Sequence, residues 1–209
     1  MKIGIIGAGN IGGTLTRRLT KLGHEVFVAN SRSPDTLSDL ARETGAHAVW
    51  ARDAARAAKL VVVTVPEKDV QGVAEFFDGV PNDVVVIDTG NYYPERDGRI
   101  GALEAGTPQS KWVSEQLRRP VIKAFNTIRA QHLMDMGRPK AEPSRIALPV
   151  AGDDTEAKKT VMQLVDDLGF DPVDDGGLDD SWRQQPGTPV YAADLDANDA
   201  RKALAEAKR

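Results

Sequence analysis

The sequence predicts an α/β fold, a Rossmann-type doubly wound and mainly parallel sheet with a small C-terminal extension. Apolar, β-branched runs alternate with helical stretches through residues 1–90, an order that requires right-handed crossovers between parallel strands. A glycine-rich loop follows the first apolar run, where such a sheet places a ligand. We expect residues 1–177 to form an NADP-binding domain and residues 178–209 to form the extension, helical and at a dimer interface.

The segment 7–12, GAGNIG, has the fingerprint of a dinucleotide-binding loop, because a short apolar strand enters it and an amphipathic helix leaves it. Gly7 permits the tight turn, Gly9 lets a pyrophosphate approach the backbone, and Gly12 lets helix and strand pack closely. The free N–H groups of the helix would then face the phosphates. The alternative is a glycine turn in an unrelated α/β protein.

The end of the second predicted strand, residues 25–29, indicates NADP rather than NAD. An NAD site usually has Asp or Glu at this position, where it accepts a hydrogen bond from the ribose 2′-hydroxyl. This chain has the polar run 30–33, NSRS, instead. The Ser31 hydroxyl and the Arg32 guanidinium suit a 2′-phosphate. Alternatively, both belong to a solvated turn in which Ser33 caps the next helix.

The remaining strands and helices are predicted from hydrophobic periodicity and from the Pro and Gly residues that end each element. We expect further strands at 46–50, 60–66, 83–88, 120–124, 145–151 and 170–173. We expect helices at 34–44, 51–58, 68–77, 111–117, 129–136 and 154–168, a polar loop over the site at 91–106, and an alanine-rich, poorly amphipathic surface helix at 199–208.

Ligands of a parallel sheet lie outside the carboxyl ends of its strands. This rule selects four loops that line one crevice, at residues 7–12, 30–32, 64–68 and 88–93.

The composition narrows the range of partners. A net charge of −4 and a pI near 5.5, without a basic patch, argue against nucleic acid. The chain has 0 cysteines, so it forms no disulfide and no thiolate metal site. Met1 and Lys2 lead directly into the first strand, and no apolar run approaches the length of a membrane span. We therefore expect a cytoplasmic protein without a membrane partner.

Several segments together resemble a known family. These are NIG at 10–12, NSR at 30–32, VTVP at 63–66 and VIKAFNTI at 121–128. The chain resembles the deazaflavin-dependent NADP oxidoreductases, which pass hydride between NADPH and 8-hydroxy-5-deazaflavin. It is equally similar to the cytosolic reductase domain of the six-transmembrane metalloreductases. The later run AGDD at 151–154 extends the resemblance to about Gly177.

The resemblance implies roles for individual residues. Ser31 and Arg32 would hold the 2′-phosphate, Val65 and Pro66 would line the nicotinamide ribose, and Asn126 would lie beside the nicotinamide. At Asn126 this chain has the residue of the metalloreductases, where the deazaflavin enzymes commonly have His. The full set expected to bind the cofactor is Gly7, Gly9, Asn10, Ile11, Gly12, Asn30, Ser31, Arg32, Thr64, Val65, Pro66, Asn126, Ile128 and Ala130.

The expected reaction is hydride transfer between NADP(H) and a flavin-type acceptor, which is FMN, FAD or 8-hydroxy-5-deazaflavin. It requires two flat rings held in contact rather than a side-chain nucleophile, so we expect no catalytic side chain and no metal. His24, His47 and His132 have no obvious carboxylate partner and are interpreted as structural. The resemblance also implies a homodimer.

Two other functions stay open. One is a non-enzymatic NADPH-binding sensor. The other is a dehydrogenase of a small hydroxy acid or imine, in which Lys123 would act as general acid. The favoured interpretation of Lys123 is a strand-end lysine whose amine reaches solvent. The aromatic residues that could stack on an isoalloxazine ring, although each more often belongs to a core or a rim, are Tyr92, Tyr93, Trp112 and Trp182.

Overall fold

A six-stranded, fully parallel sheet with the order β3-β2-β1-β4-β5-β6 forms the centre of the computed structural model, which describes residues 1–140 and 142–209. This sheet confirms the predicted Rossmann-type fold class. Its strands are β1 (Lys2–Ile6), β2 (Glu25–Ala29), β3 (His47–Ala48), β4 (Leu60–Val63), β5 (Val85–Asp88) and β6 (Ile122–Lys123).

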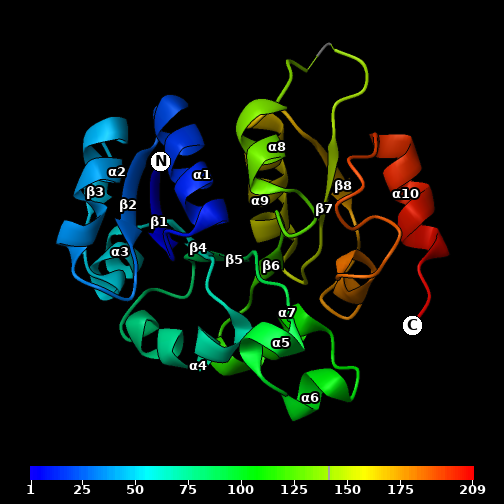
Figure 1. The fold of residues 1–209 in the computed structure, drawn as a ribbon, viewed down its shortest axis with the longest axis horizontal. Coiled ribbons are helices and arrows are strands. Elements are labelled where there is room, and N and C mark those ends of the chain that lie inside the picture. The colour runs from blue at the N-terminus through cyan, green and yellow to red at the C-terminus, as the bar shows by residue number, and fades with distance from the viewer. Residues whose placement is uncertain (141) are drawn as a thin grey trace.

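A second sheet of two parallel strands lies beside β6, on the side away from β3 (Figure 1). It consists of β7 (Ala147–Val150) and β8 (Asp171–Asp174). One antiparallel bridge, between Lys123 and Ala151, connects β6 to the end of β7.

Helices connect the strands and cover the sheet. The α-helices are α1 (Asn10–Lys21), α2 (Ser38–Thr44), α3 (Ala51–Ala57), α4 (Val70–Val73), α5 (Pro94–Asp97), α6 (Gly101–Glu104), α7 (Gln109–Leu117), α8 (Ala130–Asp135), α9 (Thr155–Asp167) and α10 (Ala197–Glu206). Turns of 3-10 helix are η1 (Pro34–Leu37), η2 (Glu67–Asp69), η3 (Ala74–Phe77) and η4 (Ser181–Gln184).

The central strands are buried on both faces, so alternate side chains enter two separate cores. In β4, Leu60 and Val62 pack with α1, α8 and α9, whereas Val61 and Val63 pack with α3, α4 and α7. This arrangement explains why the strands are continuous apolar runs in the sequence.

Several element boundaries differ from the predictions. The helix expected at 68–77 is divided among η2, α4 and η3, because Gly72 and its β-branched and aromatic neighbours are weak helix formers. The strand expected at 120–124 pairs only over Ile122–Lys123, next to Pro120, which lacks an N–H donor. The loop expected at 91–106 contains α5 and α6, and Pro94 occupies the first turn of α5.

The C-terminal helix α10 differs most from its expectation. Instead of lying loosely on the surface, it buries Ala200, Ala203 and Leu204 against Ala147 and Val173 of the two-stranded sheet. The small alanines let the helix approach the strands closely, which is why a weakly apolar face suffices. Within the described residues, no helix is long and apolar enough to cross a membrane.

The contact between β1 and α3 provides a test of the packing. A Cβ at Gly4 would lie 2.5 Å from the Ala54 carbonyl oxygen, whereas a Cβ at Gly72 meets no atom within 4 Å. We expect Gly4→Ala to lower the free energy of unfolding by about 1–3 kcal/mol through overpacking. Gly72→Ala, the matched control in a helix, should be neutral or stabilising. Equal midpoints of urea unfolding for the two variants would contradict the close approach.

Candidate functional site

Three cavities adjoin the glycine loop, and two of them meet at the carboxyl ends of the central strands. One, of about 590 Å³, extends toward the end of β2, and the other, of about 470 Å³, extends toward the loop after β6. They share Gly9, Thr64, Val65 and Pro66, so together they form one continuous crevice. All the residues predicted to bind the cofactor line this crevice except Gly12, which lies behind the loop.

The glycine loop is shaped by close backbone contacts. Gly7 has a φ of 108°, in the region that favours glycine, and its N–H donates to the Ala29 carbonyl at 2.8 Å. A Cβ at Gly12 would lie 1.8 Å from the Gly7 carbonyl oxygen, whereas a Cβ at Gly9 would meet nothing within 4 Å. Gly12 therefore serves the packing, and the open space at Gly9 faces the cavities.

Among the described residues, no side chain accepts a hydrogen bond from the first N–H groups of α1. Its N-cap residue is Gly9, no side chain caps the helix, and the first turn carries no acidic residue. Unpaired N–H groups and the positive end of the helix dipole make such a terminus a site for an anion.

The larger cavity ends at the polar run after β2. Asn30 Oδ1 accepts from the Arg32 N–H at 2.8 Å, which folds the run into a turn, while Ser31 and Arg32 remain exposed. Ser33 Oγ accepts from the Asp35 N–H at 3.3 Å and so caps η1. The two interpretations of this run are thus compatible, because the cap leaves the Arg32 guanidinium at the cavity.

The smaller cavity is lined by the segment after β6. Phe125 has a φ of 63°, an uncommon conformation for a bulky residue, and such strain often marks a functional loop. The Asn126 amide group donates to the Gln184 carbonyl at 2.7 Å and to Asn91 Oδ1 at 3.1 Å. Asn126 Oδ1 is buried and has no hydrogen-bond donor among the described residues.

The four aromatic residues considered for stacking on the acceptor lie in different surroundings. Tyr93 lines the smaller cavity. Tyr92 is buried with its hydroxyl donating to the Gly98 carbonyl at 3.0 Å, and Trp112 belongs to the core beneath the sheet. Trp182 lies against the guanidinium of Arg183.

Sequence reasoning missed Tyr191, which lines the same cavity as Tyr93. It lies in the C-terminal segment, and no local pattern in the polar sequence around it indicates a site.

The prediction that the Lys123 amine reaches solvent is wrong. The side chain is 0% exposed, and Nζ lies 3.1 Å from Asp88 Oδ2 and donates to the Gly90 carbonyl. Ser110 Oγ donates to the same carboxylate oxygen at 2.6 Å. The ion pair forms because Asp88 and Lys123 are register partners on adjacent strands.

Glu67 is a buried acid beside this pair. It is 0% exposed, and neither carboxyl oxygen has a hydrogen-bond partner within the described residues. A Cβ at Gly90 would lie 2.5 Å from Glu67 Oε1, so the carboxyl group supports the loop that walls the smaller cavity. Burial, reinforced by the charge of Asp88, raises the pKa of Glu67 to about 8. Sequence reasoning missed Glu67 because a charged residue after Pro66 is expected to be exposed.

The expectation that the histidines have no carboxylate partner is also wrong, since two of them have carboxylate neighbours. His132 Nδ1 lies 2.6 Å from Asp194 Oδ2, and His47 Nε2 lies 3.9 Å from Glu25. Neither histidine lines the two cavities at the glycine loop. The His132 contact joins α8 to the C-terminal segment.

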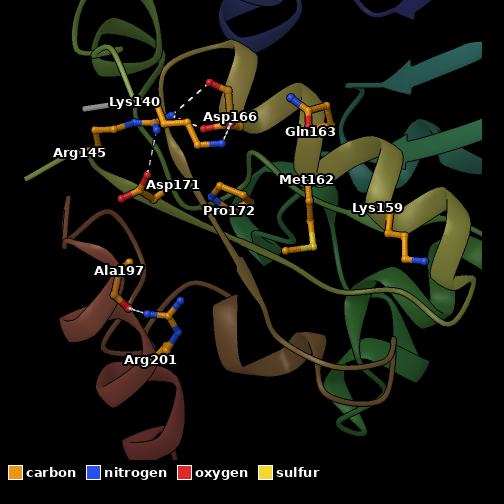
Figure 2. A pocket seen from close by; sticks show the side chains of 10 residues that line it. All are labelled: Lys140, Arg145, Lys159, Met162, Gln163, Asp166, Asp171, Pro172, Ala197 and Arg201. Atoms are coloured by element: carbon orange, nitrogen blue, oxygen red, sulfur yellow. Dashed lines mark hydrogen bonds and ion pairs between the residues drawn. The ribbon is translucent and has the colours of Figure 1, made fainter. Parts of the chain in front are cut away.

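A further cavity, of about 620 Å³, lies between α9, β8 and α10 (Figure 2). Its Arg145 is 2% exposed and is held by Asp166 at 2.9 Å and Asp171 at 3.2 Å. The Arg201 guanidinium donates to the Ala197 carbonyl at 3.1 Å. This cavity shares no lining residue with the crevice, and its buried arginine is already paired.

Comparison with a family model adds an independent finding. Residues 2–92 match the model described as NADP oxidoreductase, coenzyme F420-dependent. Among curated proteins, the chain is 40% identical over 92 residues to "Putative protein YjhV" of Escherichia coli (strain K12), covering 44% of this chain and 60% of that protein. It is 28% identical over 177 residues to "Metalloreductase STEAP3" of Rattus norvegicus, covering 85% of this chain and 34% of that protein. The chain thus spans less than two thirds of either relative.

Two solved structures are similar over most of their length. A hypothetical protein, SMa0349 from Sinorhizobium meliloti, has a TM-score of 0.80 and 31% identity, covering 93% of this chain and 95% of that one. A putative F420-dependent NADP reductase from Arthrobacter sp. FB24 has a TM-score of 0.72 and 25% identity, covering 87% of each chain. Both resemblances predicted from the sequence are confirmed.

The raised pKa of Glu67 predicts how stability depends on pH. An unfolded glutamate loses its proton near pH 4.5, whereas Glu67 in the folded chain keeps its proton up to about pH 8. The folded state binds more protons in this range, so the free energy of unfolding should fall as pH rises from about 4.5 to 8, by up to about 1.4 kcal/mol per pH unit. Glu67→Gln should remove this contribution in urea unfolding between pH 5 and 9.

Asp175 provides the control, because burial raises its pKa to about 7. Asp175→Asn should flatten the profile only below about pH 7, leaving the fall toward pH 8 that is assigned to Glu67. A Glu67→Gln profile parallel to that of the wild type would contradict a protonated Glu67.

Proposed function

We propose that this chain, whose residues 2–92 match the model of the coenzyme F420-dependent NADP oxidoreductases, transfers hydride between NADP(H) and a flavin or deazaflavin acceptor. Coenzyme F420 is an 8-hydroxy-5-deazaflavin. The observation that carries the proposal is the uncapped N-terminus of α1, which opens at Gly9 into two connected cavities.

The crevice fits NADP(H) along its length. The pyrophosphate would lie at Gly7, Gly9, Asn10 and Ile11, where the free N–H groups of α1 can donate to it. Gly12 would take part indirectly, by holding α1 against the Gly7 carbonyl.

The two ends of the crevice differ in chemistry, as the two ends of NADP(H) do. At the end of the larger cavity, Ser31 and Arg32 would bind the 2′-phosphate, within a turn that Asn30 holds. In the smaller cavity, the unpaired Asn126 Oδ1 would accept a hydrogen bond from the nicotinamide carboxamide. Thr64, Val65, Pro66, Ile128 and Ala130 would line the ribose and the ring.

NADPH, when bound, supplies a hydride from its nicotinamide ring. The contribution of the chain is to hold the ring and the acceptor in contact, at about 3–3.5 Å between reacting atoms, and to exclude water from between them. The smaller cavity has a volume of about 470 Å³, and the acceptor would lie against its polar wall, which is formed by Asn91, Tyr93 and Tyr191. The acceptor would be FMN, FAD or 8-hydroxy-5-deazaflavin.

The alternative dehydrogenase of a hydroxy acid or imine would use Lys123 as general acid. The Lys123 amine is 0% exposed, binds Asp88 and Gly90, and does not line the smaller cavity. These contacts favour a structural ion pair over a general acid. Hydride transfer between two rings needs no contact between Lys123 and the substrate.

Arg32 provides the test of cofactor choice. We expect Arg32→Ala to weaken NADPH binding about 10- to 100-fold, the loss of a charge-assisted hydrogen bond, and to leave NADH binding unchanged. Arg52→Ala is the matched control, since Arg52 is exposed on α3 and does not line the crevice. Calorimetric titration measures both cofactors, and equal wild-type affinities for NADPH and NADH would contradict the assignment.

An acceptor panel tests the reaction itself. The wild-type protein is mixed with NADPH and FMN, FAD or 8-hydroxy-5-deazaflavin, and the nicotinamide absorbance is followed. We expect turnover with at least one acceptor. NADPH binding without turnover by any acceptor would favour the non-enzymatic sensor instead.

A further inference from the structure

Two tyrosines from distant parts of the sequence meet in the wall of the smaller cavity. Tyr93 precedes α5, in the loop after β5, and Tyr191 lies in the C-terminal segment before α10. Both side chains are half-buried, and their hydroxyl groups form a hydrogen bond with each other. The cavity is the one we assign to the nicotinamide and the acceptor.

Hydrogen bonds fix the position of Tyr191 from both sides. The N–H of Ala192 donates to the Thr127 carbonyl at 2.9 Å, and the Gln184 carbonyl accepts from the Asn126 amide at 2.7 Å. The contact between His132 and Asp194 adds a third attachment. The C-terminal segment is therefore part of the cavity wall.

The two phenols are the only weak acids on this wall among the described residues. The residues lining the cavity include no Asp, Glu, His, Lys or Cys. The cationic residues on the wall are Arg96 and Arg129, and a guanidinium group does not serve as a proton donor in proteins. Among the described side chains on this wall, the two tyrosines are therefore the candidates for a proton donor.

The surroundings of Tyr93 suit a proton donor. Burial, together with the hydrogen bond to Tyr191, raises the pKa of Tyr93, so its phenol is protonated at neutral pH but releases the proton less readily than a free tyrosine. The Arg96 guanidinium lies 5.1 Å from the centre of the Tyr93 ring, where its charge stabilises a transient phenolate.

We propose that Tyr93 donates the proton that accompanies hydride transfer, and that Tyr191 resupplies it. This inference rests on the proposed function. As a C–H bond of the dihydronicotinamide breaks and its hydride joins the acceptor ring, Tyr93 gives its phenolic proton to a ring nitrogen of the acceptor. Tyr93 then takes the proton of Tyr191, which takes one from water. Each cycle oxidises one NADPH, reduces one acceptor and consumes one proton.

The kinetic test compares Tyr93→Phe and Tyr191→Phe with the wild type in single-turnover reduction of FMN and of 8-hydroxy-5-deazaflavin. General acid catalysis contributes about 10²- to 10⁴-fold, so we expect Tyr93→Phe to slow the transfer at least about 10²-fold. Tyr191→Phe should slow it less. In the wild type the rate should be lower in D₂O, and Tyr93→Phe should change this solvent isotope effect, which a purely structural role would not do.

A binding measurement gives a second readout. Fluorescence titration of the protein–NADP⁺ complex with FMN or 8-hydroxy-5-deazaflavin should show weaker acceptor binding in Tyr93→Phe and unchanged NADP⁺ affinity. Tyr92→Phe is the matched control: its hydroxyl donates to the Gly98 carbonyl at 3.0 Å, outside the cavity. This control should lower the melting temperature without altering the rate or the isotope effect.

The outcomes distinguish the two proposals. A wild type that reduces acceptors, with Tyr93→Phe equal to it in rate, isotope effect and acceptor affinity, overturns the proton donor and leaves the proposed function intact. A wild type that binds NADPH but reduces no acceptor overturns both.

Discussion

The contact between the first turn of α1 and the glycine loop is the constraint on which the rest of the site depends. Gly12 lies so close to the Gly7 carbonyl that a Cβ would come within 1.8 Å of it, and this contact fixes the start of the helix above β1. The N-cap is a glycine without a side-chain acceptor, so the N–H groups of the first turn are left for a ligand. The same feature thus stabilises the fold and leaves the N–H groups on which the proposed anion site depends.

The end of the crevice that we propose for the nicotinamide is built from segments that are remote in sequence. Asn126 joins the loop after β6 to the loop after β5 and to the C-terminal segment. Below it, the buried pair of Asp88 and Lys123 holds the Gly90 carbonyl, and the protonated Glu67 lies against the same glycine. These contacts support the wall of the cavity from beneath, and the buried charges of Asp88 and Lys123 do not line the cavity itself.

The sequence predicts those parts of the fold that depend on local patterns. Strands β1, β4 and β5 are buried on both faces, so their apolar runs identify them, and the glycine spacing identifies the loop. The burial of Lys123 could not be predicted, because its partner Asp88 is 35 residues away and only the register of β5 and β6 brings the two together. Glu67 and Tyr191 were missed for the same reason, since their surroundings are made by tertiary contacts.

A crystal structure of the protein with NADP⁺ tests the central claim most directly. We predict density for the pyrophosphate at the N-terminus of α1, the 2′-phosphate at Arg32, and the nicotinamide beside Asn126 with one face open toward Tyr93. Density for the nucleotide in the cavity between α9 and α10, or a pyrophosphate held away from Gly9, would contradict the account.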